Sequence, residues 1–419
     1  MRQGAGWLLV VLLMGACGPT ATEAPRAGAE SVTVLVGGRV QVAPEAAAIA
    51  DGVVVIRNGL ITDVGRRADV RVPAGATVID CAGGTVTAGF WNSHVHFTQP
   101  VWREAATAPA ERLTAALHAM LTSYGVVRVL DTGSFLANTE ALRRRVESGE
   151  LPGPAIMVAS GNLVPVGGSP YYILPARLPE ALSVPVVVAI AEATLDRGAE
   201  GIKLFTGSSA APRSIVVMPV ELVRAATEVA HRRGRFVIAH PGNSAGARAA
   251  IEGGVDILAH TFPSGAVTGV PWDRAIPGMM REHGMALIPT LKLWPYELAK
   301  ASVPAEITRI FLGTAQEQLR AFVDVGGQVL FGTDVGYMTD YDPTDEYVYM
   351  QQAGMSYAQI LTALTTAPAA RFGAASRAGR LAPGFVGDVV VLDGDPAGDI
   401  RALARVHATL RGGRVVYQR

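Results

Sequence analysis

Eight short apolar runs, several of them separated by stretches of helical periodicity, constrain the fold of this chain more than any other feature. The runs are residues 88–91, 126–130, 155–159, 201–205, 236–239, 255–259, 285–289 and 328–332. Helical stretches such as 111–123, 220–233 and 357–367 accompany them. Repeated alternation of strand and helix predicts parallel βαβ units, and eight units over about 290 residues predict an α/β protein with a (β/α)8 TIM barrel. An open doubly wound sheet is the alternative, but the glycine-rich phosphate turn usual after its first strand is absent from the sequence.

The segments on either side of this region have a different sequence pattern, in which short β-type runs alternate with turn signals. An Asn-Gly pair at 58–59 lies between two apolar runs and is a hairpin signal, and a Gly-Gly pair at 412–413 marks a turn. We therefore expect residues 31–87 and 381–419 to build one small composite β-sandwich, with a barrel domain at 88–380 inserted between them.

The first 17 residues are typical of an export signal. Arg2 supplies a positive charge, residues 7–14 form an apolar run, and small residues precede Cys17. The run is far shorter than the roughly 20 residues that cross a bilayer, so it indicates a secretory signal rather than a transmembrane helix. A cysteine in this place resembles a bacterial lipobox, which predicts a lipoprotein signal peptide at 1–17 and a tether at 18–30.

An acylated Cys17 would make the protein exported, periplasmic and membrane-anchored through its lipid alone. Met14 stands where leucine is usual in a lipobox, so ordinary cleavage near Ala16 with soluble export is the alternative. The other cysteine of the chain is Cys81, so lipidation of Cys17 would leave no partner for an intramolecular disulfide. We expect the core and any bound metal to supply the stability instead.

Charge and composition narrow the classes of partner. The chain carries 36 Lys and Arg against 36 Asp and Glu, so nothing indicates a nucleic acid or another polyanion as partner. Its 49% hydrophobic and 17% charged residues are typical of a compact globular protein. A small molecule or a dipeptide is the expected partner, and a homo-oligomer is compatible with this composition.

A His-x-His pair follows the first apolar run. His94 and His96 flank Val95, so on a strand both imidazoles lie on one face and can lean onto one metal ion. Further polar residues stand in or after later runs, and the ends of barrel strands meet at one face, where active sites of this fold lie. These further residues are Lys203 in the fourth run, His240 and His260 after the fifth and sixth, and Asp334 after the eighth. The other histidines fall elsewhere and are expected to be structural or exposed; they are His118, His231, His283 and His407.

With these six residues the chain resembles the amidohydrolase superfamily, and within it the imidazolonepropionase-like branch that includes Xaa-Pro dipeptidases. The segments 354–356, 367–371, 379–384 and 387–393 match that superfamily too.

Two departures from the superfamily pattern leave the substrate open. Ser169 stands where many relatives have a histidine after paired glycines. Pro241-Gly242 follows His240, where many relatives have a further polar residue or histidine.

The resemblance implies a centre of two divalent metal ions. Zn2+ suits imidazole and carboxylate ligands, and Mn2+, Co2+ or Ni2+ would fit the same set. A lysine ammonium has no lone pair, so Lys203 fits the centre only as an N6-carboxylated side chain; a buried lysine paired with a carboxylate is the alternative. The implied ligands are His94, His96 and Asp334 on one metal, His240 and His260 on the other, and Lys203 as the bridge.

The resemblance also implies the reaction. A metal-activated water would attack a carbonyl carbon, and Asp334 would act as the catalytic residue that carries a proton to the leaving amine. A structural role for Asp334 as a helix N-cap after a strand is the alternative. The top loops are expected to set specificity, and the candidate substrate-binding residues on them are Ser169, Tyr171, Tyr172, Lys292, Trp294, Tyr296 and Tyr337.

The sequence therefore predicts a metal-dependent amidohydrolase that cleaves the C–N bond of a peptide, such as an Xaa-Pro dipeptide, or of an N-acyl amino acid. A cyclic amide or lactone hydrolase is one alternative, because the same water attacks any of these carbonyls. A metal-binding lipoprotein without catalysis is the other.

Overall fold

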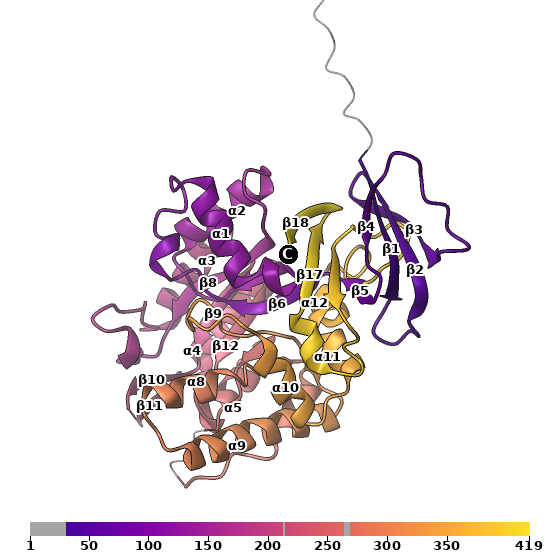
Figure 1. The fold of residues 1–419 in the computed structure, drawn as a ribbon. Coiled ribbons are helices and arrows are strands. Elements are labelled where there is room, and N and C mark those ends of the chain that lie inside the picture. The colour runs from indigo at the N-terminus through magenta and orange to yellow at the C-terminus, as the bar shows by residue number, and fades with distance from the viewer. Residues whose placement is uncertain (1–30, 213, 264–268) are drawn as a thin grey trace, which may run out of the picture.

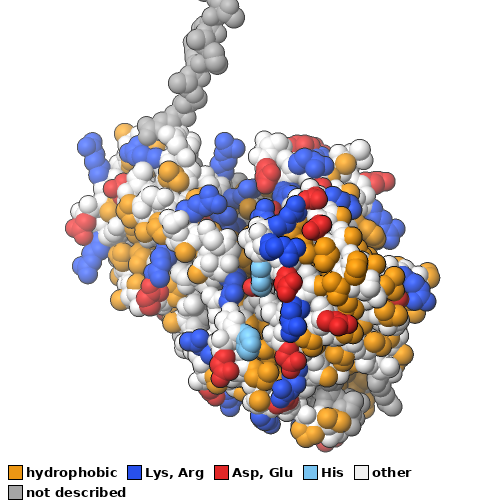
Figure 2. Space-filling view, turned by 180° about the vertical axis from the view of Figure 1, so that it is seen from behind, with side chains coloured by type: hydrophobic (Ala, Val, Ile, Leu, Met, Phe, Trp, Pro, Cys, Tyr) orange, Lys and Arg blue, Asp and Glu red, His pale blue; other side chains and the backbone are white. Residues whose placement is uncertain are grey.

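A computed structural model describes residues 31–212, 214–263 and 269–419 of the chain (Figure 1). The predicted signal peptide, the tether and Cys17 lie outside these residues. Within the described parts, no helix is both long and apolar enough to cross a membrane. The face seen in Figure 2 carries acidic and basic side chains interspersed with one another.

The centre of the fold is a parallel sheet of eight strands that follow one another in chain order. Each strand pairs in parallel with the next, as βαβ units require. The strands are β6 (Phe90–Val95), β7 (Val126–Asp131), β8 (Ala155–Leu163), β9 (Gly201–Phe205), β12 (Phe236–His240), β13 (Ile257–Ala259), β14 (Ala286–Ile288) and β15 (Gln328–Val329).

Backbone hydrogen bonds join the first strand to the segment after the last. The Ser93 amide donates to the Phe331 carbonyl at 2.7 Å and the His96 amide to the Val335 carbonyl at 2.8 Å. The Asp334 amide donates to the His94 carbonyl at 2.9 Å. The mixed α/β fold expected from the sequence is confirmed, and the sheet fits a TIM-like barrel. The eighth run is shorter as a strand than predicted, because after Val329 the backbone leaves regular pairing.

Helices connect the strands and cover the sheet. They are α1 (Ala110–Met120), α2 (Leu136–Glu147), α3 (Val184–Asp196), α4 (Val220–Arg232), α5 (Ser244–Glu252), α7 (Ile276–Glu282), α8 (Leu293–Lys300), α9 (Ala305–Asp324), α10 (Thr344–Gln352), α11 (Tyr357–Leu364) and α12 (Thr366–Arg371). The predicted stretch 357–367 is two helices rather than one. Ser356 and Gln359 form a capping box at the start of α11. Pro368 lacks the amide that would continue the hydrogen bonding to Leu364, which favours the break at Thr365.

The terminal segments share a second, mixed sheet. Its order is β18-β17-β16-β5-β1-β2-β3, and β4 also pairs with β1. The antiparallel pair β5–β16 joins the N-terminal part to the C-terminal part. The strands are β1 (Val32–Gln41), β2 (Ile49–Arg57), β3 (Leu60–Arg66), β4 (Thr77–Asp80), β5 (Gly84–Ala88), β16 (Val389–Asp393), β17 (Val406–Arg411) and β18 (Arg414–Gln418). The two termini therefore lie in one sheet, while their arrangement as a two-layer sandwich and the domain limits at 88 and 380 stay predictions.

A buried ion pair ties this β region to the barrel. Arg128 on β7 donates from Nε and Nη2 to Asp388 Oδ2 at 3.0 and 2.8 Å, and the Gly412 amide donates to Asp388 Oδ1 at 2.9 Å. The guanidinium also lies 5.3 Å from the centroid of Trp91, whose ring stacks on Phe372 at 5.7 Å. These groups lie near the first residues of the strands, so side chains fill that end of the barrel and leave the opposite end for a site.

We expect Asp388→Asn to lower the free energy of unfolding by about 3 kcal/mol, because it leaves a mostly buried guanidinium without its counter-charge. Chemical denaturation followed by circular dichroism measures the change. The matched control is Asp196→Asn, which removes an ion pair between exposed side chains of Asp196 and Arg233 and should have little effect. Equal stability losses in the two variants would contradict the role of Asp388.

Candidate metal centre

The structure brings the six predicted residues together at the carboxyl ends of the strands. Ring centroids lie 5.2 Å apart for His94 and His96, 4.6 Å for His94 and His260, and 4.8 Å for His240 and His260. Lys203 lies on β9 next to β12, where Ile238 is its partner in register. These side chains come from segments far apart in the sequence, and they converge because parallel strands end at one face.

Asp334 lies close to both histidines of the pair. Its Oδ1 lies 2.9 Å from His96 Nε2 and 3.4 Å from His94 Nε2. Yet among the described residues neither this oxygen nor either ring nitrogen of His94 has a hydrogen-bond partner. His94 is 0% and Asp334 5% exposed. Buried polar atoms are nearly always paired, so ligand atoms left without partners point to a missing electrophile.

A metal ion fits this arrangement. Donor atoms of His94, His260 and Asp334 lie within 4.8 Å of one another, and all three residues are buried. Two imidazoles and one carboxylate are donors that Zn2+ and related divalent ions accept. The residues present therefore fit a metal, which would satisfy the atoms that the protein leaves without partners.

Burial keeps these histidines neutral, as metal ligation requires. It lowers the pKa of His94 and of His240 to about 3, and the nearby Lys203 charge lowers both further. The pKa of His260 is also held well below its usual value, first by burial and then by His94. For Asp334, burial alone would raise the pKa, but His94 and His96 hold it well below its usual value. The centre thus combines neutral nitrogen donors with an ionised oxygen donor.

Lys203 is 2% exposed and lies among these groups. Burial lowers its pKa to about 8, against the opposing charges of Asp334 and then Asp131. A lysine with this pKa spends a substantial fraction of its time as the neutral amine near pH 8. The neutral amine is the form that reacts with CO2.

Thr290 orients one of the histidines, and sequence reasoning missed it. His260 Nδ1 lies 2.7 Å from Thr290 Oγ1, and both residues are buried. With the proton on Nδ1 donated to this hydroxyl, Nε2 keeps its lone pair for a metal. Thr290 and His260 both have positive φ, 44° and 71°, so the loops after β13 and β14 hold an unfavourable backbone to make this contact.

Asn92 joins the His-x-His segment to the Asp334 segment and was also missed. Its Oδ1 accepts hydrogen bonds from the amides of His94 and Thr333, each at 3.2 Å, and its Nδ2 donates to Thr333 Oγ1 at 2.7 Å. A polar residue inside an apolar run was the signal in the sequence. The loop after Asp334 lies directly against the backbone of His96, because a Cβ on Gly336 would lie 1.6 Å from the carbonyl oxygen of His96.

Three of the candidate substrate-binding residues have a polar partner within the protein. Ser169 Oγ accepts from the Leu178 amide at 3.1 Å. Lys292 Nζ pairs with Asp340 Oδ2 at 2.9 Å, and Trp294 Nε1 donates to Thr261 Oγ1 at 2.8 Å. The polar atoms of Ser169, Lys292 and Trp294 are therefore each paired with another part of the protein.

The open tyrosines lie on two loops. Tyr171 and Tyr172 lie on the short helix η3 (Tyr171–Ile173) and are 42% and 41% exposed. The Tyr172 ring meets that of Tyr337 with centroids 5.7 Å apart. Tyr296 lies nearby on α8, where its hydroxyl is 3.2 Å from Thr339 Oγ1.

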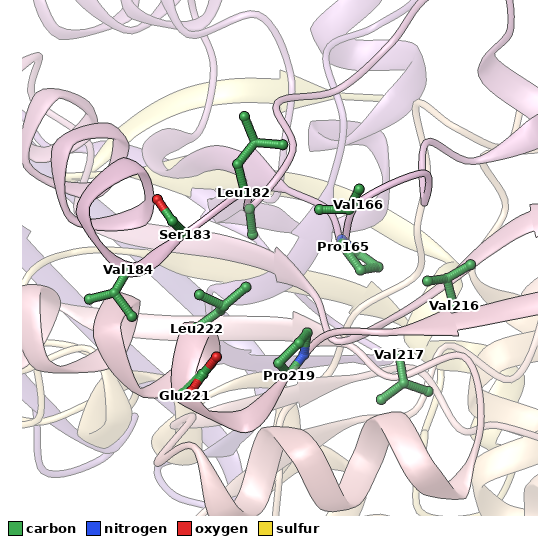
Figure 3. A pocket seen from close by; sticks show the side chains of 11 residues that line it. Pro165, Val166, Leu182, Ser183, Val184, Val216, Val217, Pro219, Glu221 and Leu222 are labelled. Carbon is green, nitrogen blue, oxygen red and sulfur yellow. The ribbon is translucent and has the colours of Figure 1, made fainter.

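A separate hollow lies on the flank of the barrel (Figure 3). It measures about 460 Å³ and contains none of the six residues of the centre. Its lining includes Val166 and Leu182 from the loop after β8, Val217 from β11 (Ser214–Val217), and Leu222 from α4. The chemistry described above belongs to the strand ends and not to this hollow.

Comparison with known proteins agrees with the geometry. The model of the amidohydrolase family matches residues 85–416, a span that contains all six residues of the centre. The chain belongs to the amidohydrolase family. The protein is accordingly a hydrolase, of a family that is generally metal-dependent. A comparison with curated protein sequences found no match.

Solved structures that resemble this amidohydrolase include three of interest. A prolidase complexed with N-methylphosphonate-L-proline is 26% identical with a TM-score of 0.76, over 93% of this chain and 100% of that one. An Xaa-Pro dipeptidase with bound methionine is 21% identical with a TM-score of 0.78, over 93% and 100%. The ochratoxinase of A. niger is 20% identical with a TM-score of 0.75, over 93% and 96%. Because their sequence identities are this low, the last two structures support the fold alone.

We expect Thr290→Val to weaken Zn2+ binding by about 10- to 100-fold, because valine keeps the shape of threonine but removes the acceptor that orients His260. Competition with a chromogenic chelator measures the affinity. Thr290→Ser keeps the hydroxyl and is the matched control, with affinity near that of the parent. Similar affinities in the valine and serine variants would show that the hydroxyl does not orient the ring.

Proposed function

We propose that this amidohydrolase uses two divalent metal ions to hydrolyse the C–N bond of an Xaa-Pro dipeptide or an N-acyl amino acid. Zn2+ is the metal that we propose for both positions. One observation carries the proposal: buried donor atoms of His94 and Asp334 face each other without partners, beside His260, at the strand ends of a barrel-like sheet. The likeness to a prolidase at 26% identity supports a peptide or acyl-amide substrate.

We assign the ligands as the resemblance implied, with Lys203 as an N6-carboxylated bridge. Carboxylation needs no further reagent than CO2: the neutral amine forms an N–C bond and releases a proton to solvent. The lowered pKa of Lys203 supports this step. The assigned sets are His94, His96 and Asp334 for one metal and His240 and His260 for the other.

When bound, the metals would lower the pKa of a water molecule and polarise the carbonyl under attack. Asp334, ionised by its low pKa, takes a proton from the attacking water. The water oxygen bonds to the carbonyl carbon, the C–N bond breaks, and Asp334 returns the proton to the leaving nitrogen. Thr290 and Asn92 hold His260 and the Asp334 segment in place meanwhile. The dry surroundings strengthen each charge interaction.

We also propose that the protein is exported and held at the membrane by a lipid on Cys17. The support is the arrangement of a charged residue, an apolar run and small residues before that cysteine. An anchored enzyme of this kind would act on small substrates in the periplasm.

Purified, metal-loaded protein should hydrolyse members of a panel of Xaa-Pro dipeptides and N-acyl amino acids, and elemental analysis should find about two metals per chain. Cyclic amides and lactones belong in the same panel as competing substrates. If the protein hydrolyses lactones but no amide, the proposed reaction is wrong and lactone hydrolysis takes its place. A single metal with unmodified Lys203 in the mass spectrum would replace the binuclear centre.

We expect Asp334→Asn to retain much of its metal and to lose nearly all turnover, because an amide oxygen can still donate a lone pair but cannot carry the proton. The measurements are metal content after dialysis and kcat on the best panel substrate. Asp131→Asn is the control for a buried carboxylate nearby, whose oxygens accept from Ser134 Oγ at 2.7 Å and Thr139 Oγ1 at 2.6 Å. Activity in Asp334→Asn equal to that of the parent would refute proton transfer by this residue.

A further inference from the structure

A buried carboxylate on α10 holds the backbone of the loop that carries Thr290. Glu346 is 0% exposed, and its two oxygens accept hydrogen bonds from the amides of Leu291 and Lys292 at 2.9 and 2.7 Å. Thr290 directly precedes these two amides, and its hydroxyl lies 2.7 Å from His260 Nδ1. The carboxylate therefore fixes the backbone next to the group that orients a histidine of the centre.

Lys292 makes a contact in the opposite direction, from that loop to the segment before α10. Lys292 is 5% exposed, and its Nζ pairs with Asp340 Oδ2 at 2.9 Å and donates to the carbonyl oxygens of Asp340 and Asp342. Both aspartates lie between Asp334 and the start of α10. Glu346 and Lys292, which we call the buried clamp, thus join the two segments by hydrogen bonds from both sides.

The clamp places two charged groups where an apolar contact would cost less free energy. Burial raises the pKa of Glu346 to about 7, and the amides of Lys292 and Leu291, followed by the Lys292 charge, act against that rise. Apolar side chains of similar volume can cover a buried loop without the cost of removing charges from water. Two acceptor oxygens add something that apolar packing does not, because they specify where two backbone amides lie.

Thr290 is the residue through which the clamp can reach the centre. Its φ of 44° is a conformation that β-branched residues rarely adopt, so this backbone needs a restraint from its surroundings. A return to a common conformation would move the hydroxyl relative to His260. The amides that Glu346 binds follow Thr290 directly, so the carboxylate opposes that return.

We infer that Glu346 and Lys292 are positioning residues of the metal centre, which hold the Thr290 hydroxyl against His260 so that Nδ1 keeps the proton and Nε2 keeps the lone pair. This inference rests on the proposed function, because it takes His260 as a metal ligand. The clamp also ties the segment that follows Asp334 to the loop that orients His260. Two ligands from different strands thereby keep their spacing.

The first test needs no metal. In metal-free protein with isotopically labelled histidine, long-range proton–nitrogen correlation by NMR distinguishes the two neutral tautomers of the His260 ring. We expect the proton on Nδ1 in the parent and a mixture of tautomers in Glu346→Gln, because a carboxamide offers one acceptor oxygen and turns an N–H toward the second amide. Lys292→Met keeps the apolar stem and removes the ammonium, so it should cause a smaller shift in the same direction. If Glu346→Gln does not fold, Lys292→Met carries the test.

The second test measures Zn2+ affinity by competition with a chromogenic chelator. Glu346→Gln should weaken binding about 10-fold in the parent. The same substitution should cause little further loss in Thr290→Val, where the hydroxyl is already absent, because residues that act through one another are not additive. Equal losses in the two backgrounds would show that the carboxylate acts by another route, and the inference would be wrong.

Glu200→Gln is the matched control, because it makes the same chemical change at the opposite end of the barrel. Glu200 directly precedes β9, its Oε2 accepts from the Val158 amide at 2.8 Å, and its Oε1 pairs with Arg143 at 2.7 Å. It should leave the tautomer of His260 and the Zn2+ affinity as in the parent.

The outcomes separate this inference from the proposed function. A parent with the proton on Nε2 of His260, or a tautomer that neither Glu346→Gln nor Lys292→Met changes, would overturn the inference even if the protein hydrolyses amides. A tautomer that depends on Glu346 in a protein that hydrolyses no amide would support the positioning role and contradict the proposed reaction instead.

Discussion

Buried lone pairs without protein partners are the constraint on which the rest of this structure depends. The two ring nitrogens of His94, one of which carries a hydrogen and the other a lone pair, and one carboxylate oxygen of Asp334 make no hydrogen bond to any described residue. Each such atom costs about 1–3 kcal/mol when it is left unsatisfied. A barrel-like sheet can hold these atoms together because its strands are fixed by backbone bonding and apolar packing elsewhere. The arrangement is suited to a ligand that satisfies several of the atoms at once.

Hydrogen bonds from other segments hold that arrangement in place. Asn92 connects the first strand to the Asp334 segment, and Thr290 orients His260 from the loop after β14. Gly336 allows the Asp334 loop to lie directly against the backbone of His96, where no side chain fits. These supports decide where the donor atoms lie. Reaction chemistry in this protein is thus a property of at least four separate segments.

The two ends of the barrel have different roles for the same physical reason. Near the strand starts, Trp91 and Phe372 stack and Arg128 pairs with Asp388, so that end is filled and bound to the second sheet. At the strand ends, loops carry partly exposed tyrosines above buried donors. Stability and chemistry are thereby separated along the strand axis.

The strand-helix alternation and the places of the six residues could be predicted from the sequence, because both depend on spacing along the chain. The pairing of β5 with β16, the short β15, and the partners of Asn92 and Thr290 could not, since they depend on which distant segments touch. Lys292 shows the same limit, because the pairing of its ammonium with Asp340 depends on a distant segment. The sequence by itself determined which groups stand at strand ends. Only the tertiary structure decided which of them keep free lone pairs, because burial and hydrogen bonding arise where separate segments pack together.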